Sequence, residues 1–114
     1  MAKKKRRASY LTVSQQYVLN VACRALAPFG YGTFHVGSSL TNPDYHDVDL
    51  RCILDDDEYG RLIGGRGSKE RLAFLNTAIS EWIAARTGLP IDFQFQQQTD
   101  ANAKFKGRRN SVGH

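Results

Sequence analysis

The first patterned stretch of the chain has apolar residues at the spacing of an α-helix. Thr12 and Gln15 stand at its start in the arrangement of a capping box, which favours a helix N-terminus there. Pro28 and Gly30 interrupt the pattern and predict the end of the helix. Its apolar positions are Val13, Tyr17, Val18, Val21, Ala22, Ala25 and Leu26.

A second long helix is predicted after Ser68, whose side chain suits the N-cap position. Gly88 and Pro90 predict its end. Its apolar stripe consists of Leu72, Leu75, Ile79, Trp82 and Ile83. We interpret Trp82 as a core residue, and we expect a shorter helix around 56–63.

Three stretches, 33–36, 47–54 and 91–96, have the β-forming residues or the alternation of strands. In the last two, apolar side chains share one face and polar side chains share the other. A sheet covered on both faces would instead read as a continuous apolar run. The sequence therefore predicts a small α/β (α+β) domain, with helices on one face of a short sheet and an open polar face on the other.

Length and composition restrict the class of protein. The chain has 114 residues, of which 41% are hydrophobic and 24% charged, as expected for one globular domain. Cys23 and Cys52 are too few for a disulfide framework and do not have the spacing of a zinc site. No apolar run approaches the ~20 residues of a membrane helix. We therefore expect a cytoplasmic protein without membrane contact.

The net charge of +5 comes from the two ends of the chain. Residues 1–7 carry five basic residues and 104–109 carry four, whereas the rest has seven basic and eleven acidic residues. We therefore divide the chain into a disordered basic arm at 1–8, a folded domain at 9–98 and a basic C-terminal tail at 99–114. The basic ends suit contact with a nucleic-acid backbone, and solubilising ends are the alternative.

Aspartates mark the polar face of the predicted sheet. Asp47 and Asp49 are two residues apart on one strand and project to the same side. Asp92 joins them if its strand pairs beside theirs. Two carboxylates at ~5 Å repel by roughly 3 kcal/mol at an effective dielectric of 20, so such a cluster favours a hard cation, Mg²⁺ or Mn²⁺. The alternative for Asp47 and Asp49 alone is a solvated face.

The segment Gly37-Ser38-Ser39 follows the first strand and precedes a polar loop. Its backbone N–H groups and hydroxyls suit phosphate oxygens, with an ordinary turn as the alternative. The segment and the aspartates together form a pattern much rarer than its parts. Two other strand residues receive structural roles: we expect His35 to be hydrogen-bonded within the fold and Arg51 to form an ion pair on the polar face.

Gly37-Ser38, Asp47-Val48-Asp49-Leu50 and Asp92 within 90–93 together resemble the signature of the DNA polymerase β-like nucleotidyltransferase superfamily, closest to its minimal single-domain members. The resemblance covers roughly residues 12–97. It implies a short mixed sheet flanked by helices, a Gly-Ser loop that holds a nucleoside triphosphate, and paired aspartates that bind two divalent metal ions.

Carried over by position, the resemblance implies that Gly37 and Ser38 contact phosphate, with Ser39 as a substitute for Ser38 in a tighter loop. It implies that Asp47 and Asp49 bind the metal ions and that Asp92 serves the metal nearest the acceptor hydroxyl. The implied catalytic and metal-binding residues are therefore Asp47, Asp49 and Asp92, with two Mg²⁺ (or Mn²⁺) ions as cofactors.

The implied reaction transfers a nucleoside monophosphate from a nucleoside triphosphate to a hydroxyl on nucleic acid or protein, with pyrophosphate as the leaving group. The sequence departs from the family in a shortened loop at 39–46, in His46 where serine or threonine is common, and in the short stretch after residue 97. The shortened loop and the short stretch after residue 97 suggest one alternative, a non-catalytic or regulatory relative that binds a protein partner, as in a toxin–antitoxin pair. The basic ends of the chain suggest another, a basic nucleic-acid-binding module without a nucleotide site.

Overall fold

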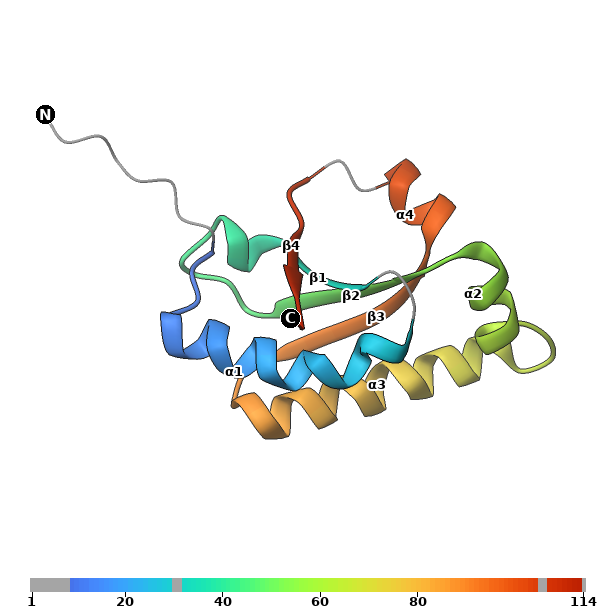
Figure 1. Cartoon of the computed structure of the whole chain (residues 1–114), viewed down its shortest axis with the longest axis horizontal. Helices are drawn as coiled ribbons and strands as arrows, with labels where there is room; N and C mark the ends of the chain where they lie inside the picture. The colour runs from blue at the N-terminus through green and yellow to red at the C-terminus, as the bar shows by residue number, and fades with distance from the viewer. Residues whose placement is uncertain (1–8, 30–31, 105–106, 114) are drawn as a thin grey trace, which may run out of the picture.

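The computed structural model describes residues 9–29, 32–104 and 107–113, so the predicted basic arm at 1–8 lies outside the described residues. The elements follow one another along the chain as helices and strands of an α+β domain (Figure 1). They are α1 (Val13–Cys23), the 3₁₀ helix η1 (Arg24–Phe29), β1 (Gly32–Val36), the 3₁₀ helix η2 (Ser38–Leu40), β2 (Val48–Leu54), α2 (Asp56–Ile63), α3 (Ser68–Thr87), β3 (Ile91–Gln97), α4 (Gln98–Lys104) and β4 (Asn110–Val112).

The strands form one four-stranded mixed sheet in the order β3-β2-β1-β4. β1 pairs antiparallel with both β2 and β4, whereas β2 pairs parallel with β3. α2 and α3 provide the long connection that a parallel pair requires. The prediction of an α+β domain with a short sheet is confirmed, and the sheet is mixed.

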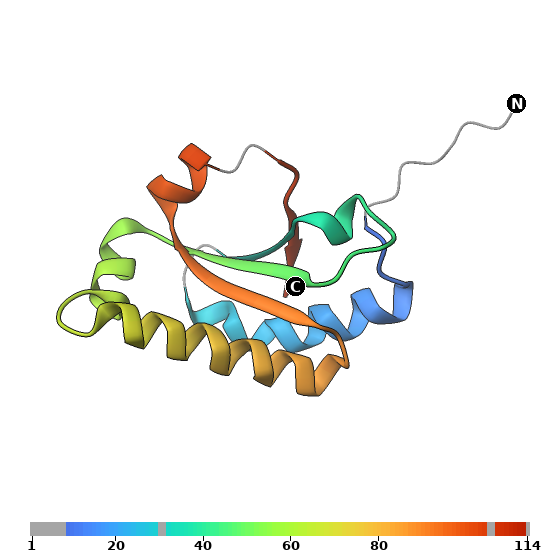
Figure 2. The ribbon, with the colours of Figure 1, turned by 180° about the vertical axis from the view of Figure 1, so that it is seen from behind.

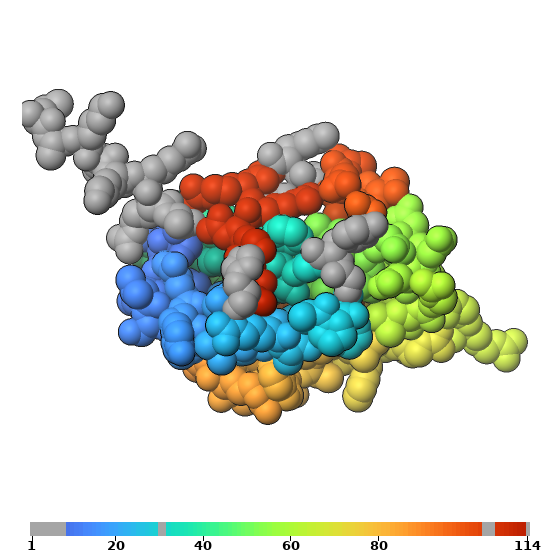
Figure 3. Space-filling view, viewed as in Figure 1, coloured from blue at the N-terminus to red at the C-terminus, as the bar shows by residue number. Residues whose placement is uncertain are grey.

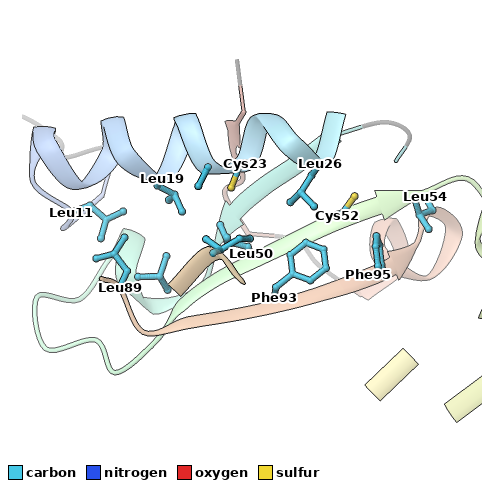
Figure 4. Packing of buried hydrophobic residues seen from close by; sticks show 13 residues of the cluster. Leu11, Leu19, Cys23, Leu26, Leu50, Cys52, Leu54, Leu89, Phe93 and Phe95 are labelled. Atoms are coloured by element: carbon cyan, nitrogen blue, oxygen red, sulfur yellow. The ribbon is translucent and has the colours of Figure 1, made fainter. Parts of the chain in front are cut away.

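The hydrophobic core lies between the sheet and the pair of helices α1 and α3, which run side by side beneath it (Figures 1 and 2). Leu19 of α1 and Leu26 of η1 point toward Leu50, Phe93 and Phe95 of the sheet (Figure 4). The alternation of β2 and β3 explains this arrangement, because every second side chain along each strand is apolar and points into the same layer.

The C-terminal part of the chain differs from the prediction, because residues 98–104 form α4 and 110–112 form β4. α4 lies on the opposite side of the sheet from α1 and α3 (Figures 1 and 2), so the prediction of helices on one face alone is wrong. β4 extends the sheet and lies against α1 (Figure 3). Directly after β4, Gly113 N donates to Asn20 Oδ1 of α1 at 2.6 Å. The polar face is therefore covered over part of its length.

α1 begins at the predicted capping box, since Gln15 N donates to Thr12 Oγ1 at 3.1 Å and Thr12 N donates to Gln15 Oε1 at 2.8 Å. The predicted apolar stripe is wrong for part of the helix. Tyr17 is 68% exposed whereas Leu19 is 1% exposed, and these two residues lie roughly 200° apart around a helix. α1 contacts the core through Leu19, Ala22 and Cys23, and η1 continues this contact through Leu26. Val13, Tyr17 and Val21 of α1 are left exposed.

Trp82 of α3 is 38% exposed, so its assignment to the core is wrong. Its neighbour Ile83 faces the sheet and is fully buried. Adjacent helix positions differ by roughly 100°, so only one of the two can occupy the buried face. The Arg86 guanidinium lies 3.5 Å from the centre of the Trp82 ring and covers it by a cation–π contact.

Side chains of α3 bind the outer edge of β3. Phe93 N donates to Ser80 Oγ at 2.8 Å, and Phe95 N donates to Asn76 Oδ1 at 3.0 Å. Because β3 is an edge strand, its outward N–H groups have no neighbouring strand to pair with. These contacts satisfy two of those groups and fix the position of β3, which carries Asp92.

Candidate functional site

Two of the three predicted aspartates lie together on the polar face of the sheet. Asp49 of β2 and Asp92 of β3 are register partners on neighbouring parallel strands, whose backbones are about 4.8 Å apart. Asp49 is half-buried, and the Asp92 side chain is 42% exposed. Asp47 precedes β2 and is exposed. The structure thus brings Asp49 and Asp92 together and leaves Asp47 at the margin of the pair.

The pKa of the Asp49 carboxyl is raised above its ordinary value. Burial is the largest cause, and the nearby charges of Asp92 and Asp47 and a hydrogen bond with Asp92 act in the same direction. Arg51 opposes them. A carboxylate that is partly desolvated and surrounded by other carboxylates is a group that a divalent cation stabilises.

Within 9–29, 32–104 and 107–113, no group of three or more His, Cys, Asp or Glu side chains is arranged to hold a metal ion. The oxygens of Asp49 and Asp92 are ligands of the type that Mg²⁺ and Mn²⁺ prefer. This pair would supply ligands for one shared cation. With Asp47 outside the pair, the described side chains provide an incomplete ligand set for a second ion.

Arg51 binds the backbone beside the two carboxylates. Its Nη1 donates to Asp92 O and to Leu50 O, both at 2.8 Å, and its Nη2 lies 3.6 Å from Asp92 Oδ2. The Arg51 side chain is only 16% exposed. The prediction of a structural ion pair is confirmed, with Asp92 as the partner. Arg51 therefore supplies fixed positive charge next to the aspartate pair.

The Gly-Ser segment begins at Gly37, immediately after β1. Gly37 has φ +81° and ψ −160°, a conformation that only glycine adopts readily. Ser38 is exposed at the start of η2, whereas Ser39 is fully buried, with its Oγ 2.5 Å from His35 Nε2. The segment thus places an exposed hydroxyl at Ser38 and turns Ser39 away from the polar face.

His35 has the structural role that the sequence predicted. It is 3% exposed and bonded to Ser39. Burial, and to a lesser extent the charge of Arg108, lowers the pKa of His35 from 6.5 to about 4. The imidazole is therefore neutral at pH 7 and is poorly suited to accept a proton there.

A pocket of about 200 Å³ lies over the polar face beside Asp49. Its lining includes Phe34, Gly37, Asp49, Arg51, Gln96 and Arg109. Alternation along the strands could have identified Gln96, because it shares the polar face with Asp92. Sequence reasoning missed Arg109 as a site residue, because the predicted tail at 99–114 gave no signal of the strand that carries it to the sheet.

No protein-family model matches the chain, and no curated protein or solved structure is significantly similar to it. The resemblance at 37–38, 47–50 and 90–93 is therefore a likeness of motifs alone, and the functional proposal depends on the geometry of the site. Among the helices of the described residues, none is long and apolar enough to cross a bilayer.

Proposed function

We propose that the chain is a metal-dependent nucleotidyltransferase, which moves a nucleoside monophosphate from a nucleoside triphosphate to a hydroxyl on nucleic acid or protein. The observation that supports this best is the pairing of Asp49 with Asp92 across β2 and β3. Gly37 lies against Asp49 of this pair, so that a phosphate chain bound at Gly37 and Ser38 would lie next to that carboxylate.

Each residue of the site has a distinct task in this proposal. Asp49 and Asp92 hold Mg²⁺ or Mn²⁺, and Asp47 is the further ligand expected from the motif. When bound, the ion stabilises the charge that develops on the phosphate oxygens during in-line attack. Gly37 admits the phosphates close to the backbone, and Ser38 donates its hydroxyl. Arg51 holds β3 in register through Asp92 O.

The first test is a thermal-shift panel of the ribo- and deoxyribonucleoside triphosphates with Mg²⁺, with Mn²⁺ and with EDTA. Ligand at 100 times its dissociation constant stabilises the fold by about 2.7 kcal/mol, which is several degrees for a domain of this size. We expect a metal-dependent shift for the wild type that Asp49→Asn loses. Asp57→Asn removes an exposed carboxylate from α2 and serves as the charge-matched control.

Transfer itself is tested with α-labelled triphosphates and three acceptor pools: RNA, DNA and protein. We expect label on one pool only, and only with divalent metal and an intact Asp49. Absence of any thermal shift at millimolar triphosphate, with or without metal, would contradict the proposal. A shift without transfer would support a nucleotide-binding protein that does not turn over.

A second candidate function, binding of a protein partner, is favoured by an exposed apolar surface on α1 and α3. Val13 is 84% exposed, Tyr17 68% and Phe74 71%, and a groove of about 410 Å³ runs between Tyr17 and Trp82. Apolar surface of this kind often marks an interaction site. If this function holds, Tyr17→Ser loses the partner and its biological effect, whereas Asp49→Asn keeps both.

The nucleic-acid alternative depends largely on residues 1–8, which lie outside the described residues. Two basic residues of the predicted tail contact the folded body: Arg108 Nη2 donates to Leu40 O and Arg109 Nη2 to Ala101 O, both at 3.0 Å. Removal of residues 1–7 alone is therefore the appropriate truncation. If the alternative holds, salt-dependent binding of nucleic acid is lost with that arm and triphosphates produce no thermal shift.

A further inference from the structure

β4 carries Arg109 to the polar face of the sheet. In the pairing of β4 with β1, Asn110 is the register partner of His35. Continued by one residue, this antiparallel register sets Arg109 opposite Val36, which directly precedes Gly37. Val36 is itself the register partner of Asp49. Register partners share a face of the sheet, so Arg109 belongs to the same face as Asp49.

Contacts with α4 fix the Arg109 guanidinium in place. Its Nη2 donates to Ala101 O at 3.0 Å, and its Nη1 donates to Asn102 Oδ1 at 3.3 Å. Both acceptors belong to α4, so these two bonds orient the guanidinium relative to the sheet. Arg109 is half-buried in this position, where it lines the pocket beside Asp49. The side chain is thus positioned by the fold rather than extended into solvent.

The polar part of the pocket lining contains two guanidinium groups, Arg51 and Arg109, one carboxylate, Asp49, and the backbone of Gly37. The rest of the lining is Phe34, Val36, Ile53 and Gln96. Arg51 is already engaged with Asp92 and the backbone of both strands. A guanidinium fork matches the geometry of phosphate oxygens and binds them through charge-assisted hydrogen bonds. An anionic group with several oxygens therefore fits this pocket better than a neutral or cationic ligand.

We propose that Arg109 is a phosphate-binding residue of the site and binds the phosphate chain of the nucleotide in the pocket beside Asp49. This inference rests on the proposed function and extends it, because it makes the C-terminal segment 107–113 part of the nucleotide site. Gly37 and Ser38 then bind the phosphates from one side and Arg109 from the other.

The test compares Arg109→Gln, Arg109→Lys and Arg61→Gln by calorimetric titration with Mg²⁺-pyrophosphate, with adenosine and with each ribonucleoside triphosphate. Arg61 is an exposed arginine in the last turn of α2 and is the control for the change in net charge. We expect Arg109→Gln to weaken pyrophosphate and triphosphate binding roughly 10- to 100-fold. Arg109→Lys loses less, and adenosine binding does not change. Arg61→Gln binds as the wild type does.

The outcomes separate this inference from the proposed function. If Arg109→Gln binds triphosphate as tightly as the wild type does, the role of Arg109 is overturned and the proposed function still stands. Pyrophosphate binding that depends on Arg109, without any triphosphate binding, supports an anion site and contradicts the proposed function. If the wild type binds neither probe, both the inference and the proposed function are overturned.

A purely structural role of Arg109 is also detectable. Equal weakening of adenosine and pyrophosphate binding in Arg109→Gln means that Arg109 only holds α4 in place, and this also overturns the inference. If Arg109→Gln does not fold, Arg109→Lys decides, because unchanged binding of both phosphate probes and adenosine would overturn the inference.

Discussion

Gly37 lies directly against the carboxylate of Asp49, so that a methyl group on the Gly37 Cα would overlap the Asp49 Oδ2 atom. This contact joins the end of β1 to the middle of the candidate site. It depends on glycine for two reasons, because the backbone has φ +81° and because no space exists for a Cβ atom. The Gly-Ser segment and the aspartate motif, which are 12 residues apart at Gly37 and Asp49, are therefore in physical contact.

Gly37→Ala should destabilise the protein through both effects. Backbone strain at such a position costs about 1–3 kcal/mol, and overlap with the Asp49 carboxylate adds to it. In an Asp49→Ala background the overlapping atoms Oδ2 and Cγ are gone, so the same substitution should cost less. A double-mutant cycle by chemical denaturation measures this difference, which we expect to be about 1 kcal/mol.

Gly88→Ala provides the control for strain without overlap. Gly88 has φ +71° at the C-cap of α3, and a Cβ atom there would meet nothing within 4 Å. Its substitution should cost about 1–2 kcal/mol, with the same value in the Asp49→Ala background. Equal costs of Gly37→Ala in the two backgrounds would show that the contact with Asp49 carries no energy.

Asp49→Asn should stabilise the protein at pH 7 in the absence of metal. The fold raises the pKa of Asp49 through burial and through the charges of Asp92 and Asp47, so ionisation of this carboxyl is harder in the folded than in the unfolded chain. The stability that the group contributes is therefore complete at pH values below its unfolded pKa and is lost as the pH rises through the folded pKa. Removal of the charge should restore up to about 1 kcal/mol at neutral pH.

Thermal unfolding between pH 3 and pH 8 tests this prediction. The melting temperature of Asp49→Asn should exceed that of the wild type by a few degrees at pH 7, and the difference should shrink as the pH falls. Asp57→Asn removes an acidic residue from the first turn of α2, where it favours the helix, and should not stabilise the protein. A less stable Asp49→Asn at pH 7 would mean that the repulsion among the carboxylates is already relieved.

The sequence was sufficient to predict the strands that carry the aspartates, because alternation directly reports the two faces of a strand. Asp49 and Asp92 face the polar side since Leu50 and Phe93, their neighbours in sequence, enter the core. Their pairing could not be derived from alternation, because periodicity within a strand contains no information on which strands are neighbours. The parallel register of β2 and β3 supplies this information, because it sets Asp49 opposite Asp92.

β4 could not be predicted, because its sequence has no periodic signal. β4 is only three residues long, Asn-Ser-Val, and its place beside β1 depends on tertiary contacts such as the bond from Gly113 N to Asn20 Oδ1. The predicted apolar stripe of α1 is partly wrong for a different reason. Its sequence has apolar residues on more than one side, so the pattern alone does not identify the buried face, and Tyr17 is exposed where Leu19 is buried.

His35 should make the protein sensitive to acid. The fold lowers its pKa from 6.5 to about 4, through burial first and the charge of Arg108 second. The stability contributed by the neutral imidazole is thus present above pH 6.5 and is lost as the pH falls toward 4, because the unfolded chain binds the proton more readily. The loss is on the order of 3 kcal/mol at most.

His35→Gln keeps a hydrogen-bonding nitrogen near Ser39 and removes the titration. We expect the free energy of unfolding of this variant to change less between pH 7 and pH 4 than that of the wild type, by denaturant titration at each pH. His46→Gln is the matched control, because His46 is exposed and its replacement should leave the acid sensitivity unchanged. Identical pH profiles for His35→Gln and the wild type would assign the acid sensitivity to other groups.

Asn76→Ala should loosen the strand that carries Asp92. Asn76 Oδ1 accepts the hydrogen bond from Phe95 N on the outer edge of β3, at 3.0 Å. Without this acceptor a partly buried N–H group is left unpaired, which costs about 1–3 kcal/mol. Thr77→Ala is the control, because Thr77 is the exposed neighbour on the same helix.

Hydrogen exchange separates a local from a global effect of Asn76→Ala. The Phe95 amide should exchange faster in this variant, while the amides of β1 keep their protection relative to global stability. The Phe93 amide still donates its hydrogen bond to Ser80 Oγ, so its exchange rate should remain closer to that of the wild type. Because β3 holds Asp92 opposite Asp49, a loosened edge should also weaken any metal-dependent nucleotide shift. Unchanged Phe95 exchange would show that water replaces Asn76 without cost and that the edge contact does not fix the strand.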